Sequence, residues 1–366
     1  MKKWKKIMAV LVTGCMLASV AACGNREEGT SENRTGSSDE KYTIAMLPKL
    51  KGENYFDACK SGADEAAEEL GVTLLYDAPP QDDATNQRQV NLIEGWVAQG
   101  IDALIVSPMD GDALAPTLQK IMDEGVKVVT YDADTIEDCR DLFVNQVDAA
   151  GVAKGLLDAA KSDLEAKGYS ADNPANLTIL SGTETDVALM TWEGEIKKLL
   201  SSDEAYDLIK LQDPETDVFR SDGSESNVNE QAAAIVANMG PGEDQYQLAF
   251  ALSTMGTAAL GAQYEAIAVK PDPEKVSLGG LSTPNGVKSY IKDEANPMNN
   301  CVLWNCMDLG YLSVQTAVQL LDGTITDDST TMNAGRLGDR QIEDGKTVVL
   351  GEAVIFDISN IDDFNY

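Results

Sequence analysis

The chain has 366 residues, of which 61 are Asp or Glu and 28 are Lys or Arg, and it contains no histidine. The formal net charge of −33 leaves no basic face that could neutralise phosphates, which excludes nucleic acid as a partner. The lack of histidine excludes serine and cysteine hydrolases with a histidine base, and metal sites built on imidazole.

The first 23 residues have the pattern of a lipoprotein export signal. A lysine-rich start is followed by an apolar stretch at 7–20 and by the sequence VAAC at 20–23. The apolar stretch is too short to span a bilayer, which takes about 20 apolar residues. We therefore expect residues 1–22 to be a signal peptide and the thiol of Cys23 to carry a lipid that anchors the protein to the outer face of the cell membrane. An ordinary signal peptide followed by a chance cysteine is the alternative.

Residues 23–41 form the next segment, which is hydrophilic after Cys23 and has no apolar side chain with which to build a core. We expect a lipidated, flexible tether there. Roughly 325 residues remain, and single hydrophobic cores stop growing below that size, so two lobes are expected.

From residue 42 the chain repeats a short β-rich apolar run, a turn and an amphipathic helix. This alternation predicts an α/β fold with two doubly wound, Rossmann-like lobes, each a parallel sheet with helices on both faces. The first lobe is predicted to have strands at 42–47, 72–76, 103–107, 126–131 and 142–146, and helices at 56–70, 85–99 and 112–124. The second is predicted to have helices at 149–166, 188–200, 227–238 and 257–268, and strands at 177–181, 207–211, 247–252 and 276–281.

Four cysteines remain after the signal: Cys59, Cys139, Cys301 and Cys306. An exported protein can form disulfides, and a 301–306 bridge is one alternative. A short strand through Trp304 would hold those two thiols apart, so we expect buried free thiols.

Ligands of doubly wound sheets bind beyond the carboxyl ends of the strands. The loops at those ends carry amides, hydroxyls, aromatic rings and carboxylates, but no nucleophile with a partner base, which indicates a binding protein without catalytic residues, cofactor or metal. Such a set suits a small polyhydroxylated ligand. The predicted ligand-binding residues are Lys49, Tyr55, Phe56, Asp132, Asp134, Asn145, Gln146, Thr185, Asp186, Ser253, Thr254, Trp304, Asn305 and Asp308.

Each of these residues has a simpler alternative role, as a helix cap or a loop end in solvent. This alternative applies in particular to Asp132, Asp134 and Asp308. Tyr55 and Phe56 could staple the first helix. Lys49 lies between a buried strand and an apolar helix start, a position that calls for an anionic or hydroxylated partner.

Eight segments in order carry a family resemblance. They are IAMLPKL with NYF (44–56), QGIDALIVSP (99–108), GVKVVTYDADT (125–135), CRDLFVNQ (139–146), GLSTPN (280–285), LWNCMDLGY (303–311), AGRLGD (334–339) and ISNIDDF (358–364). With the export signal, tether and twin lobes, the chain resembles the type I periplasmic binding proteins, the extracytoplasmic receptors of ABC importers. Within that family these segments are similar to the branch that binds autoinducer-2 or rhamnose.

The resemblance implies a hinge of three crossings, near residues 146, 282 and 323. The first lobe would combine 42–146 with 284–323, and the second 147–283 with 324–366. It also implies that Lys49 and Asp132 contact the ligand, with aromatic contacts from Tyr55, Phe56 and Trp304 and an amide contact from Asn305.

The function implied is that of a monomeric solute-binding lipoprotein of an ABC importer. It would capture a rhamnose-like monosaccharide or autoinducer-2 between two closing lobes and deliver it to permease subunits. The alternative is a sensory sugar receptor of the same fold that docks on a membrane kinase or chemoreceptor.

The chain departs from the relatives at one place. After the strand at 177–181 they carry an Asp-Gln or Asn-Gln pair that reaches the ligand. Counting back from Trp192 places Ala188 and Leu189 at that pair, whereas counting forward from Ser181 leaves Asp186 as a substitute. The ligand class follows from the resemblance, but the particular ligand does not.

Overall fold

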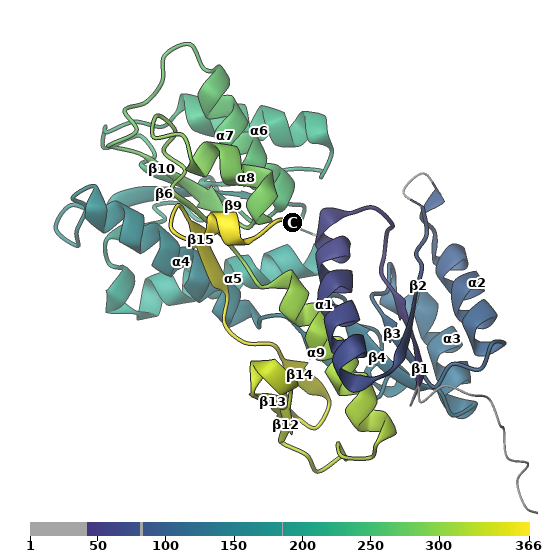
Figure 1. Ribbon diagram of the computed structural model, residues 1–366. Helices are drawn as coiled ribbons and strands as arrows, with labels where there is room; N and C mark the ends of the chain where they lie inside the picture. The colour runs from purple at the N-terminus through teal and green to yellow at the C-terminus, as the bar shows by residue number, and fades with distance from the viewer. Residues whose placement is uncertain (1–41, 81–82, 185) are drawn as a thin grey trace, which may run out of the picture. The chain divides into compact units, whose positions relative to one another are not determined.

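The computed structural model describes residues 42–80, 83–184 and 186–366 (Figure 1). The predicted signal peptide, the tether and Cys23 lie outside the described residues. Within those residues, none of the helices combines the length and hydropathy needed to cross a membrane.

The first lobe is built on an eight-stranded sheet. Its strands are β1 (Thr43–Leu47), β2 (Thr73–Tyr76), β3 (Ala103–Val106), β4 (Lys127–Tyr131), β5 (Leu142–Asn145), β12 (Thr331–Asn333), β13 (Asp339–Glu343) and β14 (Thr347–Val349). Its helices are α1 (Asn54–Leu70), α2 (Asn86–Val97), α3 (Gly111–Asp123) and α9 (Cys306–Leu321). The strand order is β12-β13-β14-β5-β4-β3-β1-β2.

Alternate residues of β1 face two different cores. Ile44 and Met46 pack in the core that holds α1 and α9, whereas Ala45 and Leu47 pack in the core that holds α2 and α3. Successive side chains of a strand point to opposite faces, so helices cover both faces of this sheet. That explains why the strands are continuous apolar runs.

The second lobe is built on a second parallel sheet. Its strands are β6 (Ala175–Ser181), β7 (Ile209–Lys210), β8 (Val218–Arg220), β9 (Leu248–Ala251) and β10 (Ser277–Gly280), and β11 (Asn300–Leu303) pairs with β15 (Val354–Asp357) beside them. Its helices are α4 (Ala149–Ala166), α5 (Val187–Ser202), α6 (Glu225–Ala237), α7 (Thr254–Ala266) and α8 (Pro284–Ile291). The order is β10-β9-β6-β7, with β8 also paired to β6.

Strand pairing places two segments in lobes other than those expected. β14 pairs in parallel with β5, which assigns the hairpin at 331–349 to the first lobe. β11 is bridged to the end of β10 through Val302 and Leu281, which assigns 284–303 to the second lobe. By this pairing the crossings follow β5, β11 and β14, whereas the resemblance implies crossings near 146, 282 and 323. These assignments depend on contacts between strands of only three or four residues, and β14 is distant from β5 in the sequence.

Helices α1 and α9 are in direct backbone contact, and Figure 1 shows them side by side. A Cβ added at Gly62 would overlap the carbonyl oxygen of Met307, and one added at Gly310 would overlap that of Cys59. Two glycines therefore set the spacing of the helices.

All four cysteines after the tether are buried and free. The expectation of buried free thiols is confirmed, and Cys301 and Cys306 form no bridge. The short strand expected through Trp304 ends one residue earlier, at Leu303.

Candidate functional site

A cavity of about 730 Å³ opens beyond the carboxyl ends of the strands, with walls from both lobes. The first lobe contributes Lys49, Leu50, Gly52, Glu53, Asn54, Tyr55, Phe56 and Asp132. The second lobe and the crossing after β11 contribute Trp192, Leu252, Ser253, Thr254, Met255, Leu281, Thr283, Leu303 and Trp304. One wall thus carries ionised groups, and the other is apolar with hydroxyls.

Asp132 is the centre of the first wall. Its Oδ2 lies 2.9 Å from the ammonium of Lys49 and accepts a hydrogen bond of 2.7 Å from the Ser107 hydroxyl. Its Oδ1 accepts one of 2.9 Å from the Tyr55 hydroxyl. An ionised carboxylate can accept about four hydrogen bonds, so these three donors leave one acceptor position for a ligand hydroxyl. Lys49 thus has the anionic partner that its position calls for.

The backbone at Asp132 is left-handed, with φ of 62°. Few residues other than glycine adopt this conformation, and such outliers concentrate at ligand sites. The side-chain amide of Gln146 donates to the carbonyl oxygen of Asp132 at 3.3 Å. Gln146 therefore holds the backbone of Asp132 and is not itself among the residues that line the cavity.

An aromatic cluster joins Tyr55 and Phe56 of the first wall to Trp304, which comes from the crossing after β11. The Trp304 indole N–H donates to the Tyr55 hydroxyl at 2.9 Å, and the two rings are nearly perpendicular, with centroids 6.3 Å apart. Phe56 contacts Tyr55 edge-on at 5.0 Å. Burial, together with the charge of Asp132, raises the pKa of Tyr55 well above its ordinary value. The Tyr55 hydroxyl therefore stays protonated and donates to the carboxylate.

The opposite wall is apolar apart from hydroxyl groups. Leu252, Met255 and Leu281 line it, and the indole of Trp192 reaches it from α5. Ser253 lies there too, although its hydroxyl also caps α7 by accepting from the Gly256 amide at 3.1 Å. Among the described lining residues, this wall carries no ionised side chain.

The predicted residues fall into two groups. Those that line the cavity are Lys49, Tyr55, Phe56, Asp132, Ser253, Thr254 and Trp304. Thr185 lies outside the described residues. The remaining members of the set lie away from the lining, and most have structural partners.

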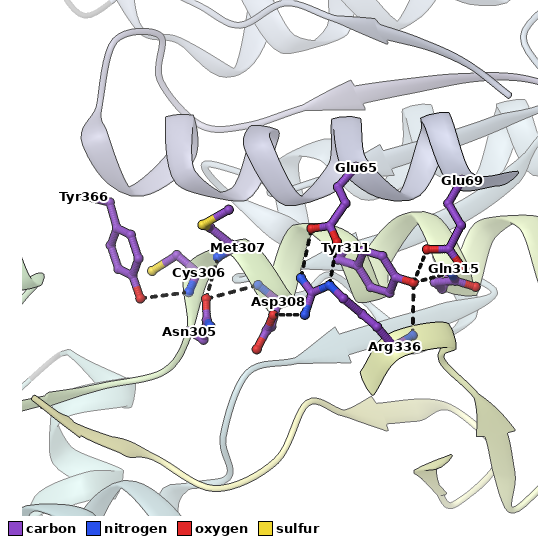
Figure 2. A network of polar contacts seen from close by, with 10 residues as sticks. All are labelled: Glu65, Glu69, Asn305, Cys306, Met307, Asp308, Tyr311, Gln315, Arg336 and Tyr366. Carbon is purple, nitrogen blue, oxygen red and sulfur yellow. Dashed lines mark hydrogen bonds and ion pairs between the residues drawn. The ribbon is translucent and has the colours of Figure 1, made fainter. Parts of the chain in front are cut away.

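Two of those remaining carboxylates are held by arginines. Asp134 accepts two hydrogen bonds, of 2.7 and 2.8 Å, from the buried guanidinium of Arg140. Asp308 accepts one of 2.6 Å from Arg336 (Figure 2). Both carboxylates join segments of the first lobe, and neither is among the residues that line the cavity, where a ligand contact was expected.

Three other predicted residues belong to secondary structure. Asn305 caps α9 by accepting from two backbone amides in its first turn (Figure 2). Asp186 caps α5 by accepting from the Leu189 amide at 3.1 Å. Asn145 ends β5, and its carbonyl accepts from the Leu350 amide at 2.8 Å. The capping alternative, raised for every residue of the predicted set, applies to Asn305 and Asp186.

Sequence reasoning missed Ser107, Trp192 and the apolar residues Leu252, Met255 and Leu281. Ser107 directly follows β3, which is a signal of the kind that selected Asp132 after β4. Trp192 lies within a predicted amphipathic helix, where an aromatic side chain is ordinarily assigned to the core. No described group of three or more Asp, Glu or Cys side chains could hold a metal ion.

Comparison with known proteins gives one family and several relatives. The family model described as periplasmic binding protein domain matches residues 44–325. The fructose import binding protein FruE of Bifidobacterium longum is 26% identical over 195 residues, which cover 50% of this chain and 57% of that protein. The ribose import binding protein RbsB of Bacillus subtilis is 26% identical over 129 residues, 35% of this chain and 41% of that one. The matches thus span about half the length of these curated relatives.

Solved structures match over most of the chain. A sugar ABC transporter structure from Actinomyces odontolyticus has a TM-score of 0.76 and 28% identity, covering 90% of this chain and 100% of that one. LsrB from Clostridium saccharobutylicum in complex with AI-2 has a TM-score of 0.70 and 20% identity, covering 88% and 100%. A solute-binding protein from Clostridium phytofermentas with bound L-rhamnose has a TM-score of 0.64 and 25% identity, covering 88% and 97%.

Proposed function

Because the chain belongs to the periplasmic binding protein domain family, we propose that it is the solute-binding component of a sugar ABC importer and holds one monosaccharide-like ligand at Asp132. It is a binding protein and not an enzyme. The names of the relatives support the sugar class, since two are import binding proteins for fructose and ribose. On this proposal the two lobes close on the ligand and present it to permease subunits.

The observation that carries the proposal is the paired charge of Asp132 and Lys49 inside the cavity. The carboxylate retains an acceptor position, and the ammonium has three donors. A single hydroxyl can therefore donate to Asp132 while it accepts from Lys49, and a neighbouring hydroxyl can use the remaining donors. The two charges compensate each other, which favours a neutral polyol over an anion or a cation. The perpendicular rings of Tyr55 and Trp304 suit the C–H face of a sugar.

A thermal-shift screen over pentoses, hexoses, 6-deoxyhexoses and autoinducer-2 tests the class. A ligand that binds only the folded protein adds about 2.7 kcal/mol of stability at a concentration of 100 times Kd. At least one member of the panel is expected to raise the melting temperature. A panel without any effect would contradict the proposal.

For the ligand itself, we propose a 6-deoxyhexose such as rhamnose, or the methylated ring of autoinducer-2. The apolar residues Leu252, Met255 and Leu281 support this choice, because a hydroxyl left without a partner against them costs about 1–3 kcal/mol. One of the similar structures, 25% identical to this chain, contains L-rhamnose, which supports the 6-deoxyhexose. Calorimetric titration should find rhamnose or autoinducer-2 bound more tightly than ribose or glucose. The reverse order would overturn the choice of ligand and leave the sugar class in place.

We also propose that the lipid anchor at Cys23 holds the protein on the outer face of the membrane. The support is the sequence pattern at 1–23. Cys23→Ala should move the protein from the membrane fraction to the soluble fraction without loss of ligand binding. If the variant stays in the membrane fraction, another element anchors the chain.

A further inference from the structure

We propose that Arg220 is a positioning residue for the cavity. Its two-pronged pair with Glu193 sets the rotation of helix α5 and thereby holds the indole of Trp192 at the cavity wall. The consequence for ligand affinity rests on the proposed function, whereas the geometry at Trp192 can be measured without a ligand.

Helix α5 packs against the second lobe through a buried carboxylate, that of Glu193. Among its described side chains, those of Glu193 and Ile196 are the buried ones, with 1% and 0% of the residue exposed. The inward position of its first half is therefore a carboxylate, where an amphipathic helix ordinarily has an apolar side chain. A buried carboxylate is tolerated only when it is paired and hydrogen-bonded, so the partner of Glu193 decides how this part of α5 is seated.

Arg220 supplies that pairing from the sheet. It is the last residue of β8, at the carboxyl edge, where its backbone is in register with Ser181 of β6. Its two terminal nitrogens donate to the two Glu193 oxygens at 2.6 and 2.9 Å. Burial alone would raise the pKa of Glu193, but the hydrogen bonds from Arg220 and Lys197 outweigh it and lower this pKa below its ordinary value. The pair is therefore ionised near neutral pH.

The planar guanidinium of Arg220, with its two parallel N–H donors forming a fork, makes the contact with Glu193 directional. Two parallel hydrogen bonds fix the carboxylate in one plane, whereas an ammonium acts as a point charge. Lys197 also contacts Glu193, at 2.6 Å, but it lies on α5 itself and so does not tie the helix to the sheet through that contact. Arg220 also approaches the sulfur of Met190 at 3.5 Å, one turn earlier on α5. The guanidinium thus contacts the helix at two successive turns.

Trp192 immediately precedes Glu193. Adjacent helical residues are separated by about 100° around the axis, so the orientation that fixes Glu193 also fixes the direction of Trp192. Trp192 is a cavity-lining residue, and it lies on the wall opposite Asp132. A rotation of α5 would move its indole along or out of that wall.

The first arm of the test uses the full chain labelled with 5-fluorotryptophan and no ligand. The fluorine resonance of Trp192 is identified by its loss in Trp192→Phe. Arg220→Lys keeps the charge and removes the fork, and should shift or broaden this resonance. The matched control is Arg336→Lys, which removes a two-pronged Arg–Glu pair with Glu65 in the first lobe and should leave the Trp192 resonance in place. If Arg220→Lys does not fold, Glu193→Gln provides the same comparison.

The second arm measures affinity by calorimetry with rhamnose as the probe. Arg220→Lys is expected to weaken binding about tenfold, and to cause little further loss when Trp192 is already Ala, because the two residues act as a unit. An unmoved Trp192 resonance in Arg220→Lys, or full additivity of the two losses, would overturn the proposal. If the unmodified protein does not bind rhamnose, the proposed choice of ligand fails, and the fluorine measurement still decides the role of Arg220.

Discussion

The indole N–H of Trp304 donates a hydrogen bond of 2.9 Å to the Tyr55 hydroxyl, whose O–H donates in turn to the Asp132 carboxylate at 2.9 Å. These three residues come from the crossing after β11, the first turn of α1 and the end of β4. The two hydrogen bonds therefore run in series from the Trp304 indole through the Tyr55 hydroxyl to the Asp132 carboxylate, and each bond polarises the next. The orientation of Trp304 and the acceptor strength of Asp132 are therefore coupled.

Trp304→Phe should weaken ligand binding roughly two- to tenfold, because a hydrogen bond contributes about 0.5–1.5 kcal/mol net and the Tyr55 hydroxyl would lose its donor. Calorimetric titration measures the change. Trp96→Phe is the control, since Trp96 is a residue of α2 that packs into the core on that face of the sheet and does not line the cavity. Equal affinities for the two variants would contradict a role of the indole N–H.

The buried thiols predict a loss of stability at alkaline pH. Burial raises the pKa of Cys301 from 9.0 to about 12, and raises those of Cys59 and Cys306 well above the ordinary value. Above about pH 9 the unfolded chain loses thiol protons that the folded chain retains, so the free energy of unfolding falls by about 1.4 kcal/mol per pH unit for each thiol. Below the ordinary thiol pKa both states are protonated and the contribution of each thiol to stability is fully present. Urea unfolding between pH 8 and 10 measures the slope, which Cys301→Ala should reduce; an unchanged slope would count against this account.

The contact between α1 and α9 predicts that Gly310 cannot be enlarged. Gly310→Ala would force its Cβ against the carbonyl of Cys59 and should destabilise the protein by about 1–3 kcal/mol. Gly95→Ala is the matched control, because its Cβ in helix α2 would meet no atom within 4 Å, and alanine is favoured over glycine in a helix by about 0.5–1 kcal/mol. Thermal unfolding should separate the two substitutions in sign, and equal melting temperatures would contradict the packing argument.

Arg336 joins three segments of the first lobe away from the cavity (Figure 2). It pairs with Glu65 at 2.7 Å and with Asp308 at 2.6 Å, and its guanidinium lies 4.4 Å from the ring centre of Tyr311. Partly exposed ion pairs contribute up to about 1 kcal/mol and an exposed cation–π contact about 0.5–1 kcal/mol. Arg336→Ala should therefore lower stability by about 1–2 kcal/mol and leave ligand affinity within about twofold. Urea unfolding measures the stability and calorimetric titration measures the affinity. A tenfold loss of affinity with unchanged stability would show that Arg336 acts in ligand binding and not in stability.

Much of the fold follows from local sequence patterns. The helix expected at 149–166 is α4, and the strand expected at 103–107 is β3, shorter by one residue. Long amphipathic stretches and buried apolar runs identify such elements locally. The short strands β8 and β12–β15 are recognised only through their partners, and those partners also decide the lobe boundaries.

The candidate site was predictable where a side chain directly follows a buried strand. Asp132 after β4 is such a case. Asp134 lies two residues further on, and Asp308 is within the first turn of α9, where the same carboxylate chemistry serves a structural arginine. The arginine that pairs with Asp308 is 28 residues away in the sequence. No local pattern therefore distinguishes a carboxylate that contacts a ligand from one that forms a structural ion pair. Trp192 was missed because helical periodicity distinguishes only buried from exposed faces. A side chain on a cavity wall is partly buried and fits neither class.

The most direct test of sugar binding at Asp132 is calorimetric titration of the unmodified protein and of Asp132→Ala with rhamnose, autoinducer-2, ribose and glucose. We predict that at least one of these binds the unmodified protein with a stoichiometry of about one. A hydrogen bond to a charged acceptor contributes about 1.5–3 kcal/mol, so Asp132→Ala should weaken that binding by roughly ten- to over a hundredfold. Undiminished affinity in Asp132→Ala, or the absence of binding by every member of the panel, would contradict the account.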